Sequence, residues 1–273
     1  MDENKISDYD LQLLVDELYQ KYGYDFSNYA TSSLKRRATR LMTIGRFSGF
    51  TEMLYKIKSD PTYLTEVIQE LTVNVTEMFR DPEVFKKIRE QILPILGTHP
   101  IIRIWHAGCS SGEEVYSMAI LLHEAGLLKK SLLYATDLNP SVIEKVSKGI
   151  FPLKYMKQFS ENYYLAGGKK DFSNYYTTKY DLAKFNNDLS AKVISATHNL
   201  VSDRSFNEFQ LIFCRNVLIY FDKILQNKVL NLFDGSLEKH GYLVLGSKES
   251  LRFSEINTKY IQLDNKEKIW KKT

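Results

Sequence analysis

Apolar residues in the first third of the chain recur at the spacing of α-helices. Four of them fall on one helical face: Leu11, Leu14, Val15 and Leu18. Gly23 follows as a stop, a second helix begins after Ser32 or Ser33, and a third begins at Pro61 and runs to Leu71. No strand-like alternation precedes residue 100. We therefore expect a small all-α N-terminal domain that ends, with its linker, near residue 85.

Beyond residue 100 the pattern changes to short β-prone runs separated by amphipathic stretches. The runs cover residues 101–105, 131–135, 210–214 and 242–245. Helical stretches at 113–124, 140–148 and 223–238 separate most of them. This alternation is typical of a parallel sheet with helices on both faces, so residues 86–273 are predicted to form an α/β domain.

One stretch, residues 151–197, does not follow the alternation. It is polar and rich in tyrosine, with Gly167 and Gly168 in its middle. Structureless loops of this length are rare in compact domains. We expect a small hairpin-bearing β insertion at about 152–195.

Composition limits the class of protein. The chain has 273 residues, of which 44% are hydrophobic and 26% charged, and this is enough apolar surface for a folded core. The two cysteines fit neither a metal site nor a disulfide framework, so we expect no metal. The polar start of the chain and the lack of an apolar run of about 20 residues favour a cytoplasmic protein that does not insert into a membrane.

A short glycine turn and an acidic residue suggest a nucleoside-binding site. Gly108 and Gly112 enclose a small-residue turn between the first predicted strand and its helix, where a ligand can approach the helix N-terminus. Asp137 ends the second strand, a position that accepts hydrogen bonds from ribose hydroxyls in Rossmann-type sites. Each feature also has a structural explanation, an ordinary turn and a helix cap. Together they favour a nucleoside cofactor.

The residues after the turn favour S-adenosylmethionine over a dinucleotide. Glu113 and Glu114 occupy the first helical positions, where a dinucleotide site needs room for pyrophosphate. Carboxylates there would repel phosphate and would suit a sulfonium ligand that carries an ammonium group. Both could instead simply complement the helix dipole.

Four segments of the chain have a distinctive sequence: LTVNVTEMFRD (71–81), WHAGCSSGEEVYS (105–117), ATD (135–137) and FCRNVLIYF (213–221). They resemble the CheR family of chemotaxis receptor glutamate methyltransferases, and GYLVLGSKES (241–250) resembles the family's last segment. The resemblance extends from about Tyr24 to the end of the chain. It implies a Rossmann-like class I methyltransferase domain with a small β insertion, behind the small all-α domain. His106 departs from the family, which more often has a small or polar residue there.

The resemblance also implies which residues hold S-adenosylmethionine and its product S-adenosylhomocysteine. Asn74, Thr76 and Arg80 would reach the amino acid part, and Glu113 or Glu114 would pair with its ammonium. Asp137 would accept the ribose hydroxyls, beside the turn at Gly108. The adenine would lie between Asn199 and Leu200, and the transferred methyl group near Asn216 and Val217. Several of these polar residues could instead cap helices, satisfy turns or form surface ion pairs.

Methyl transfer from a sulfonium to a glutamate carboxylate needs no general base. The acceptor has an unperturbed pKa of about 4.3 and is already ionised at neutral pH. Catalysis then depends on alignment and on the exclusion of water. We expect Arg80 to position the cofactor or the incoming carboxylate, with Tyr220 and Phe221 as apolar walls.

A basic stretch in the helical domain is the predicted docking surface for substrate. Residues 31–60 hold seven basic and two acidic residues, and four of the basic ones cluster: Lys35, Arg36, Arg37 and Arg40. Such a run is often only a solvated helix face, and no motif for nucleic-acid binding accompanies it. The resemblance implies chemoreceptor methylation helices, which carry paired carboxylates, as the partner. In some family members the β insertion also docks a peptide from the receptor's carboxyl end.

Two alternatives stay open at this stage. One is a methyltransferase with another substrate, although the Asn/Asp-Pro-Pro-aromatic signature of base methylation is absent after residue 214. The other is a non-catalytic adaptor that binds S-adenosylmethionine for signalling. We expect a monomer with no nucleic-acid partner.

Overall fold

The N-terminal part of the molecule is a bundle of short helices. The computed structural model describes residues 6–72 and 76–273. The bundle contains α1 (Asp8–Tyr22), α2 (Thr31–Ile44), α3 (Phe50–Ser59), a 3₁₀ turn (Pro61–Tyr63) and α4 (Leu64–Leu71). Ser7 and Asp10 form a capping box at the start of α1, and Gly23 ends it in the left-handed conformation at φ 76°. The four apolar residues of the first predicted helix are all buried in the core of this bundle.

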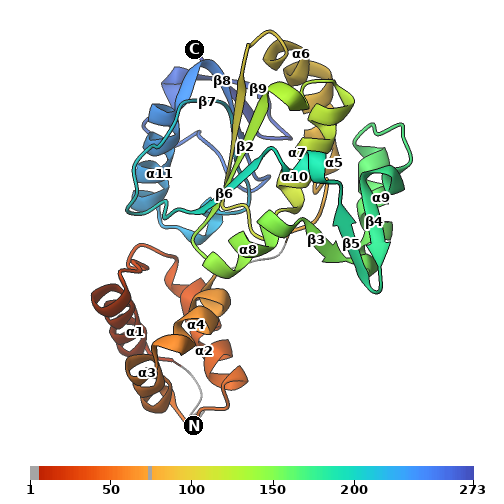
Figure 1. Cartoon of the computed structure of the whole chain (residues 1–273). Helices are drawn as coiled ribbons and strands as arrows, with labels where there is room; N and C mark the ends of the chain where they lie inside the picture. Colours follow the sequence, from red (N-terminus) through yellow and green to blue (C-terminus); the bar gives the residue numbers. More distant parts are fainter. Residues whose placement is uncertain (1–5, 73–75) are drawn as a thin grey trace.

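A seven-stranded sheet forms the centre of the second part (Figure 1). Its strands lie in the order β6 (Val193–Thr197), β2 (Ser131–Asp137), β1 (Ile102–Ala107), β7 (Phe209–Cys214), β8 (Leu237–Leu245), β10 (Ile269–Lys272) and β9 (Tyr260–Asp264). Among the described strands, β10 runs antiparallel to both of its neighbours, and the other pairs of this sheet are parallel.

Helices cover both faces of the sheet. One face packs against α5 (Pro82–Lys87), a π-helical turn (Ile88–Ile92), α6 (Leu93–Leu96), α7 (Glu113–Glu124), α8 (Pro140–Lys148) and α10 (Asn187–Ser190). The other face packs against α11 (Lys223–Ser236). Strand alternation separates the two cores, because Ile104 of β1 belongs to the first and Trp105 to the second. The Rossmann-like fold and the all-α domain before it are as predicted.

The insertion forms a small sheet of its own beside α7. Its strands lie in the order β3 (Ile150–Pro152), β5 (Leu182–Phe185) and β4 (Tyr176–Lys179), all antiparallel, and α9 (Met156–Leu165) packs with them. Figure 1 shows this unit projecting from the main sheet. The expected insertion extended to about residue 195, whereas residues 193–197 form β6 and pair with β2 in the main sheet.

Short 3₁₀ helices complete the α/β part: Leu128–Lys130, Leu153–Tyr155, Phe172–Tyr175, Leu218–Tyr220 and Asn257–Lys259. Within residues 6–72 and 76–273, no helix is long and apolar enough to span a bilayer.

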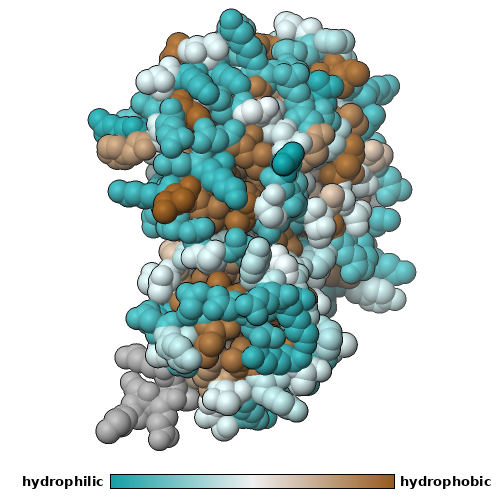
Figure 2. All heavy atoms as spheres, turned by 90° about the vertical axis from the view of Figure 1, so that its left-hand side faces the viewer, coloured by the Kyte–Doolittle hydropathy of each residue, from teal (hydrophilic) through white to brown (hydrophobic). Residues whose placement is uncertain are grey.

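The two parts are joined by a short antiparallel contact. Ala30 N–H donates to the Tyr220 carbonyl over 2.8 Å, and Asp222 N–H donates to the Asn28 carbonyl over 2.9 Å. The rings of Tyr29 and Phe221 meet edge to face with centroids 4.9 Å apart. In Figure 2 the helical part forms the lower, smaller lobe and meets the α/β lobe directly. This contact places α2 over the end of the sheet that carries the functional site.

Candidate active site

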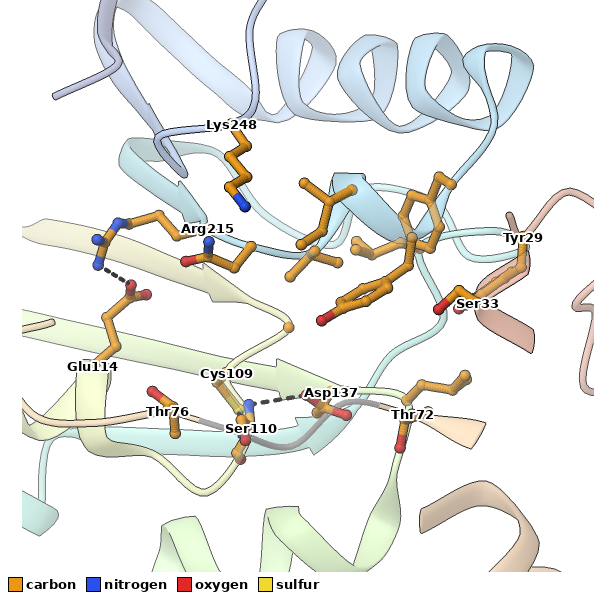
Figure 3. Close-up of a pocket in the computed structure, with 18 of the residues that line it drawn as sticks. Tyr29, Ser33, Thr72, Thr76, Cys109, Ser110, Glu114, Asp137, Arg215 and Lys248 are labelled. Atoms are coloured by element: carbon orange, nitrogen blue, oxygen red, sulfur yellow. Dashed lines mark hydrogen bonds and ion pairs between the residues drawn. The ribbon is translucent and has the colours of Figure 1, made fainter. Parts of the chain in front are cut away.

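A cavity of about 320 Å³ opens where the carboxyl ends of the strands face the helical part (Figure 3). Its walls come from the segments after five strands, at 108–110, 137–138, 198–200, 215–221 and 247–248. The linker and the helical part close it with Thr76, Arg80, Asp81, Tyr29, Ser33, Leu34, Leu71 and Thr72. From β1 the chain builds β2 and β6 on one side of the sheet and then crosses to β7 on the other side of β1. The cavity therefore lies at the switch point where open α/β sheets bind ligands.

Asp137 is held firmly in the floor of the cavity. Its carboxylate accepts hydrogen bonds from the backbone N–H of Ser110 (2.9 Å) and of Asn139 (3.0 Å). Burial raises the pKa of Asp137 above its usual value, against the effect of these hydrogen bonds. Gly108, at φ +74°, is required here because an added Cβ would lie 2.5 Å from Val217 Cγ2.

Glu114 lines the cavity and is part of a buried charge network. Its carboxylate lies 2.9 Å from His106 Nδ1 and 3.1 Å from Arg215 Nη1, and Figure 3 shows the latter contact. Burial raises the pKa of Glu114, but the hydrogen bond with His106 and the charge of Arg215 outweigh it, so the pKa is lowered. His106 is fully buried and stacks on Phe213, with ring centroids 4.7 Å apart.

Glu113, the other candidate, does not line the cavity. Its carboxylate accepts a hydrogen bond from the Ser111 hydroxyl at 2.7 Å. Burial raises the pKa of Glu113 to about 7, partly offset by that hydrogen bond. The structure thus separates two adjacent acidic residues that the sequence leaves equivalent.

Asn199, Leu200, Asn216 and Val217 all line the cavity. The turn that carries Asn216 is fixed by Glu249, whose carboxylate accepts N–H groups of Asn216 (3.0 Å), Val217 (2.9 Å) and Gly246 (2.6 Å). Asn216 itself is left-handed at φ 61°. Burial raises the pKa of Glu249, and these backbone hydrogen bonds oppose the rise. Glu249 is not among the predicted site residues, and the only sequence feature that points to it is its place in the segment 241–250.

Further polar and positively charged side chains line the cavity. Thr76, Arg80 and Tyr220 are among them, whereas Asn74 lies outside the described residues. Burial raises the pKa of Tyr220, and the nearby charges of Arg37, Arg80 and Arg36 oppose this. Lys248, which is not among the predicted site residues, extends its ammonium group into the cavity from the turn after β8 (Figure 3).

The four predicted docking residues lie on α2, outside the cavity lining. Lys35 pairs with Asp8 at 2.7 Å, and Arg40 pairs with Glu70 at 3.2 Å. Arg37 donates to the backbone carbonyls of Glu70 and Thr72. It also lies over the ring of Tyr220 at 5.8 Å, so it joins the two parts of the molecule. Arg36 is exposed.

Comparisons with known proteins identify the family. The chain matches the model for the CheR methyltransferase SAM-binding domain over residues 74–269 and the model for the CheR methyltransferase all-alpha domain over residues 9–72. The chain belongs to the CheR methyltransferase family. It is therefore an S-adenosylmethionine-dependent methyltransferase, as the four sequence segments predicted.

Individual CheR relatives align over most of their length. The chain is 44% identical to the putative methyltransferase Cher3 of Pseudomonas putida over the whole of both proteins. It is 31% identical to the chemotaxis protein methyltransferase 1 of Vibrio cholerae over 80% of each, and 29% identical to the chemotaxis protein methyltransferase of Borreliella burgdorferi over 92% of this chain and 91% of that one. A glycopeptide N-methyltransferase, MtfA, solved with S-adenosylmethionine, matches only loosely, with a TM-score of 0.36 and 10% identity over 63% of this chain and 51% of that one.

The cavity of this CheR protein fits the cofactor chemically. Two carboxylates, Asp137 and Glu114, face it from the β1–β2 side, as a ligand with ribose hydroxyls and an ammonium group requires. Ser110 Oγ and Asn216 Oδ1 are buried in its wall, and no hydrogen-bond partner for either is found in the described structure. Buried polar atoms without partners in a cavity wall indicate a polar ligand. Residues 6–72 and 76–273 contain no cluster of three or more His, Cys, Asp or Glu side chains suited to a metal ion.

Proposed function

We propose that this protein transfers a methyl group from S-adenosylmethionine to glutamate side chains of bacterial chemoreceptors, which forms glutamyl methyl esters for sensory adaptation. The relatives named chemotaxis protein methyltransferases support the pathway. The observation that carries the substrate class is the placement of charge in the cavity. The carboxylates of Asp137 and Glu114 form its acidic side, and Lys248 extends its ammonium group into it from the turn after β8, the basic side.

The acidic side would hold the methyl donor. Glu114 would face the ammonium group and Asp137 the ribose hydroxyls, while Asn199 and Leu200 would contact adenine. Glu114 is the better candidate than Glu113 because only its carboxylate lines the cavity. Thr76 and Arg80 would reach the carboxylate of the amino acid part, together with Asn74. When bound, S-adenosylmethionine supplies a methyl group on positively charged sulfur.

The basic side would receive the acceptor carboxylate. Lys248 is exposed, and its ammonium points into the cavity, where it attracts an anion. Arg80 and Tyr220 would align the attacking oxygen, and buried Phe221 keeps the wall apolar. No residue needs to remove a proton, because the carboxylate is ionised at neutral pH. The enzyme's contribution is alignment and partial removal of water from the oxygen.

Receptor docking would use the exposed cations of α2. Acidic methylation helices would meet Arg36 and Arg40 on this helix. We also keep the prediction that the inserted sheet docks a receptor carboxyl-terminal peptide. Strand β4 lies at the edge of that sheet, and its residues Thr177–Lys179 are exposed.

The test is methyl transfer from labelled S-adenosylmethionine to a receptor cytoplasmic fragment. We expect label that base releases as volatile methanol, which distinguishes esters from N-methyl or C-methyl groups. Arg80→Ala should lower kcat/KM by roughly tenfold to a hundredfold, the usual loss for a charge-assisted hydrogen bond. If calorimetry shows that the protein binds S-adenosylhomocysteine but no receptor fragment is methylated, the protein is instead a signalling adaptor. Full turnover by Arg80→Ala would remove that residue from the mechanism.

A further inference from the structure

The segment that carries Arg80 has an unusual backbone. Phe79 and Asp81, on either side of Arg80, both adopt left-handed conformations, at φ 52° and φ 55°. This conformation costs about 1–2 kcal/mol in a residue with a Cβ, and for a bulky side chain such as Phe79 it is a true outlier. Strained residues persist where the surroundings determine them, and they concentrate at functional sites. Arg80, between these two residues, lines the cavity.

Among the described residues, three separate elements donate or accept hydrogen bonds that hold this segment in place. Phe79 N–H donates to Ser117 Oγ of α7 at 2.8 Å. Arg215, after β7, donates to the Arg80 carbonyl at 3.0 Å and to the Asp81 carboxylate at 2.6 Å. The third contact comes from Asn162 of the inserted unit, whose Nδ2 donates to the Met78 carbonyl at 3.0 Å.

Asn162 contacts this segment from outside the cavity. It is 6% exposed and does not line the cavity. Its Oδ1 accepts a hydrogen bond from Gln158 Nε2 at 3.0 Å, which fixes the orientation of the amide. The ring of Phe79 also packs edge to face on Tyr163 and Phe172 of the inserted unit, with centroids 5.4 and 6.3 Å away. The inserted unit therefore holds the Arg80 segment from one side, through Met78 and Phe79.

We propose that Asn162 is a positioning residue for Arg80, and that the inserted β unit thereby completes the methyl-transfer site. The inference rests on the proposed role of Arg80. Without the Asn162 bond, the Met78 carbonyl would be left buried and unpaired, and the two left-handed residues would have one anchor fewer. The segment would relax toward ordinary backbone angles, and the Arg80 guanidinium would leave its position in the cavity. The β insertion would then serve catalysis directly, independently of any peptide bound to it.

The first experiment compares matched variants of the full chain. Asn162→Leu keeps the approximate side-chain volume and removes the donor. Asn186→Leu is the control, because Asn186 Nδ2 also donates to a backbone carbonyl within the insertion, that of Asn174 at 2.9 Å, but does not contact residues 78–81. We expect kcat/KM for methyl transfer to fall roughly tenfold in the first variant and less than twofold in the control. Equal losses in both would overturn the proposal.

The second experiment asks whether Asn162 acts through Arg80. If it does, Arg80→Ala combined with Asn162→Leu should be no slower than Arg80→Ala alone, whereas independent effects would multiply. Multiplying losses would therefore sink the inference, even with both single variants impaired. If Asn162→Leu fails to fold by circular dichroism, Asn162→Asp replaces it in the same cycle. A wild-type enzyme without turnover, or an unimpaired Arg80→Ala, would count against the proposed function instead.

Discussion

Glu113 is a buried carboxyl group at the first position of α7, and the fold disfavours its charge. Burial raises its pKa from 4.5 to about 7. Below pH 4.5 the folded and unfolded chains both hold the proton. Between about 4.5 and 7 only the folded chain holds it, so the free energy of unfolding falls as pH rises through this window. The shift corresponds to about 3 kcal/mol once pH exceeds 7.

Replacing Glu113 by glutamine should remove this pH dependence. Urea unfolding should show Glu113→Gln to be more stable than wild type by up to about 3 kcal/mol at pH 8, with the difference vanishing near pH 4.5. Glu90→Gln, at an exposed position, is the control and should change little at either pH. A gain in stability of the same size at both pH values would contradict the assignment of the effect to Glu113 ionisation.

Single residues of the site were predictable where a motif fixes both position and chemistry. The glycine turn and the acidic end of the second strand predicted that Gly108 and Asp137 share a site, and both residues line one cavity. Glu113 and Glu114 could not be told apart, because which of two adjacent helical residues faces a ligand depends on how the helix packs. Lys248 and Glu249 carry no periodic signal, and their roles depend on a turn that tertiary contacts hold.

In the turn after β8, close packing around the backbone leaves no room for a side chain at Gly246. A Cβ at Gly246 would lie 2.7 Å from the backbone nitrogen of Asn216 and 2.8 Å from Glu249 Oε2. Neither neighbour can move freely, since the Glu249 carboxylate ties both turns together. The position of the turn that carries Asn216 and Val217, after β7, therefore requires glycine at position 246, after the neighbouring strand β8.

Gly246→Ala should displace the Asn216 turn and lower kcat/KM more than tenfold, because misplacement by about 1 Å can cost a hundredfold in rate. Gly235→Ala in α11 is the matched control. A Cβ there would meet no atom within 4 Å, and alanine favours the helix, so stability should be kept or raised. Rate assays and thermal unfolding of both variants give the result. Equal activity in the two variants would refute the crowding argument.

Elements with strong periodicity were predicted well, and edge elements were not. The helices at 113–124 and 140–148 agree with α7 and α8, because their apolar faces are continuous. The hydrophobic pattern does not reveal strand β6, because this strand lies at the edge of the sheet and all of its residues are partly or fully exposed. Strand β9, at the other edge, is similarly exposed, so its sequence lacks an apolar run.

At the scale of the whole molecule, the basic residues of α2 have two different roles. The sequence predicts docking for all of them, whereas the structure uses Arg37 to join the two parts of the molecule. Arg37 joins α2 to the end of α4 and to Tyr220 of the α/β part. Reversing its charge would disturb the junction between the parts and could not test docking cleanly. Arg36 is exposed, and its positive charge acts to lower the pKa of Tyr220, which lines the cavity. Arg36 is therefore the residue to test.

Docking of an acidic receptor helix should depend on ionic strength and on where the positive charge lies. The KM for receptor should rise between about 50 and 300 mM salt, because the Debye length shortens below about 10 Å in this range. Arg36→Glu should raise the KM several-fold at low salt and flatten its salt dependence. Lys239→Glu changes the net charge of +4 equally but lies in the amino half of β8, so it should behave as wild type. Because the two variants share one net charge, a difference between them would locate recognition on α2. Identical KM values and salt slopes would show that the basic helix does not guide the receptor.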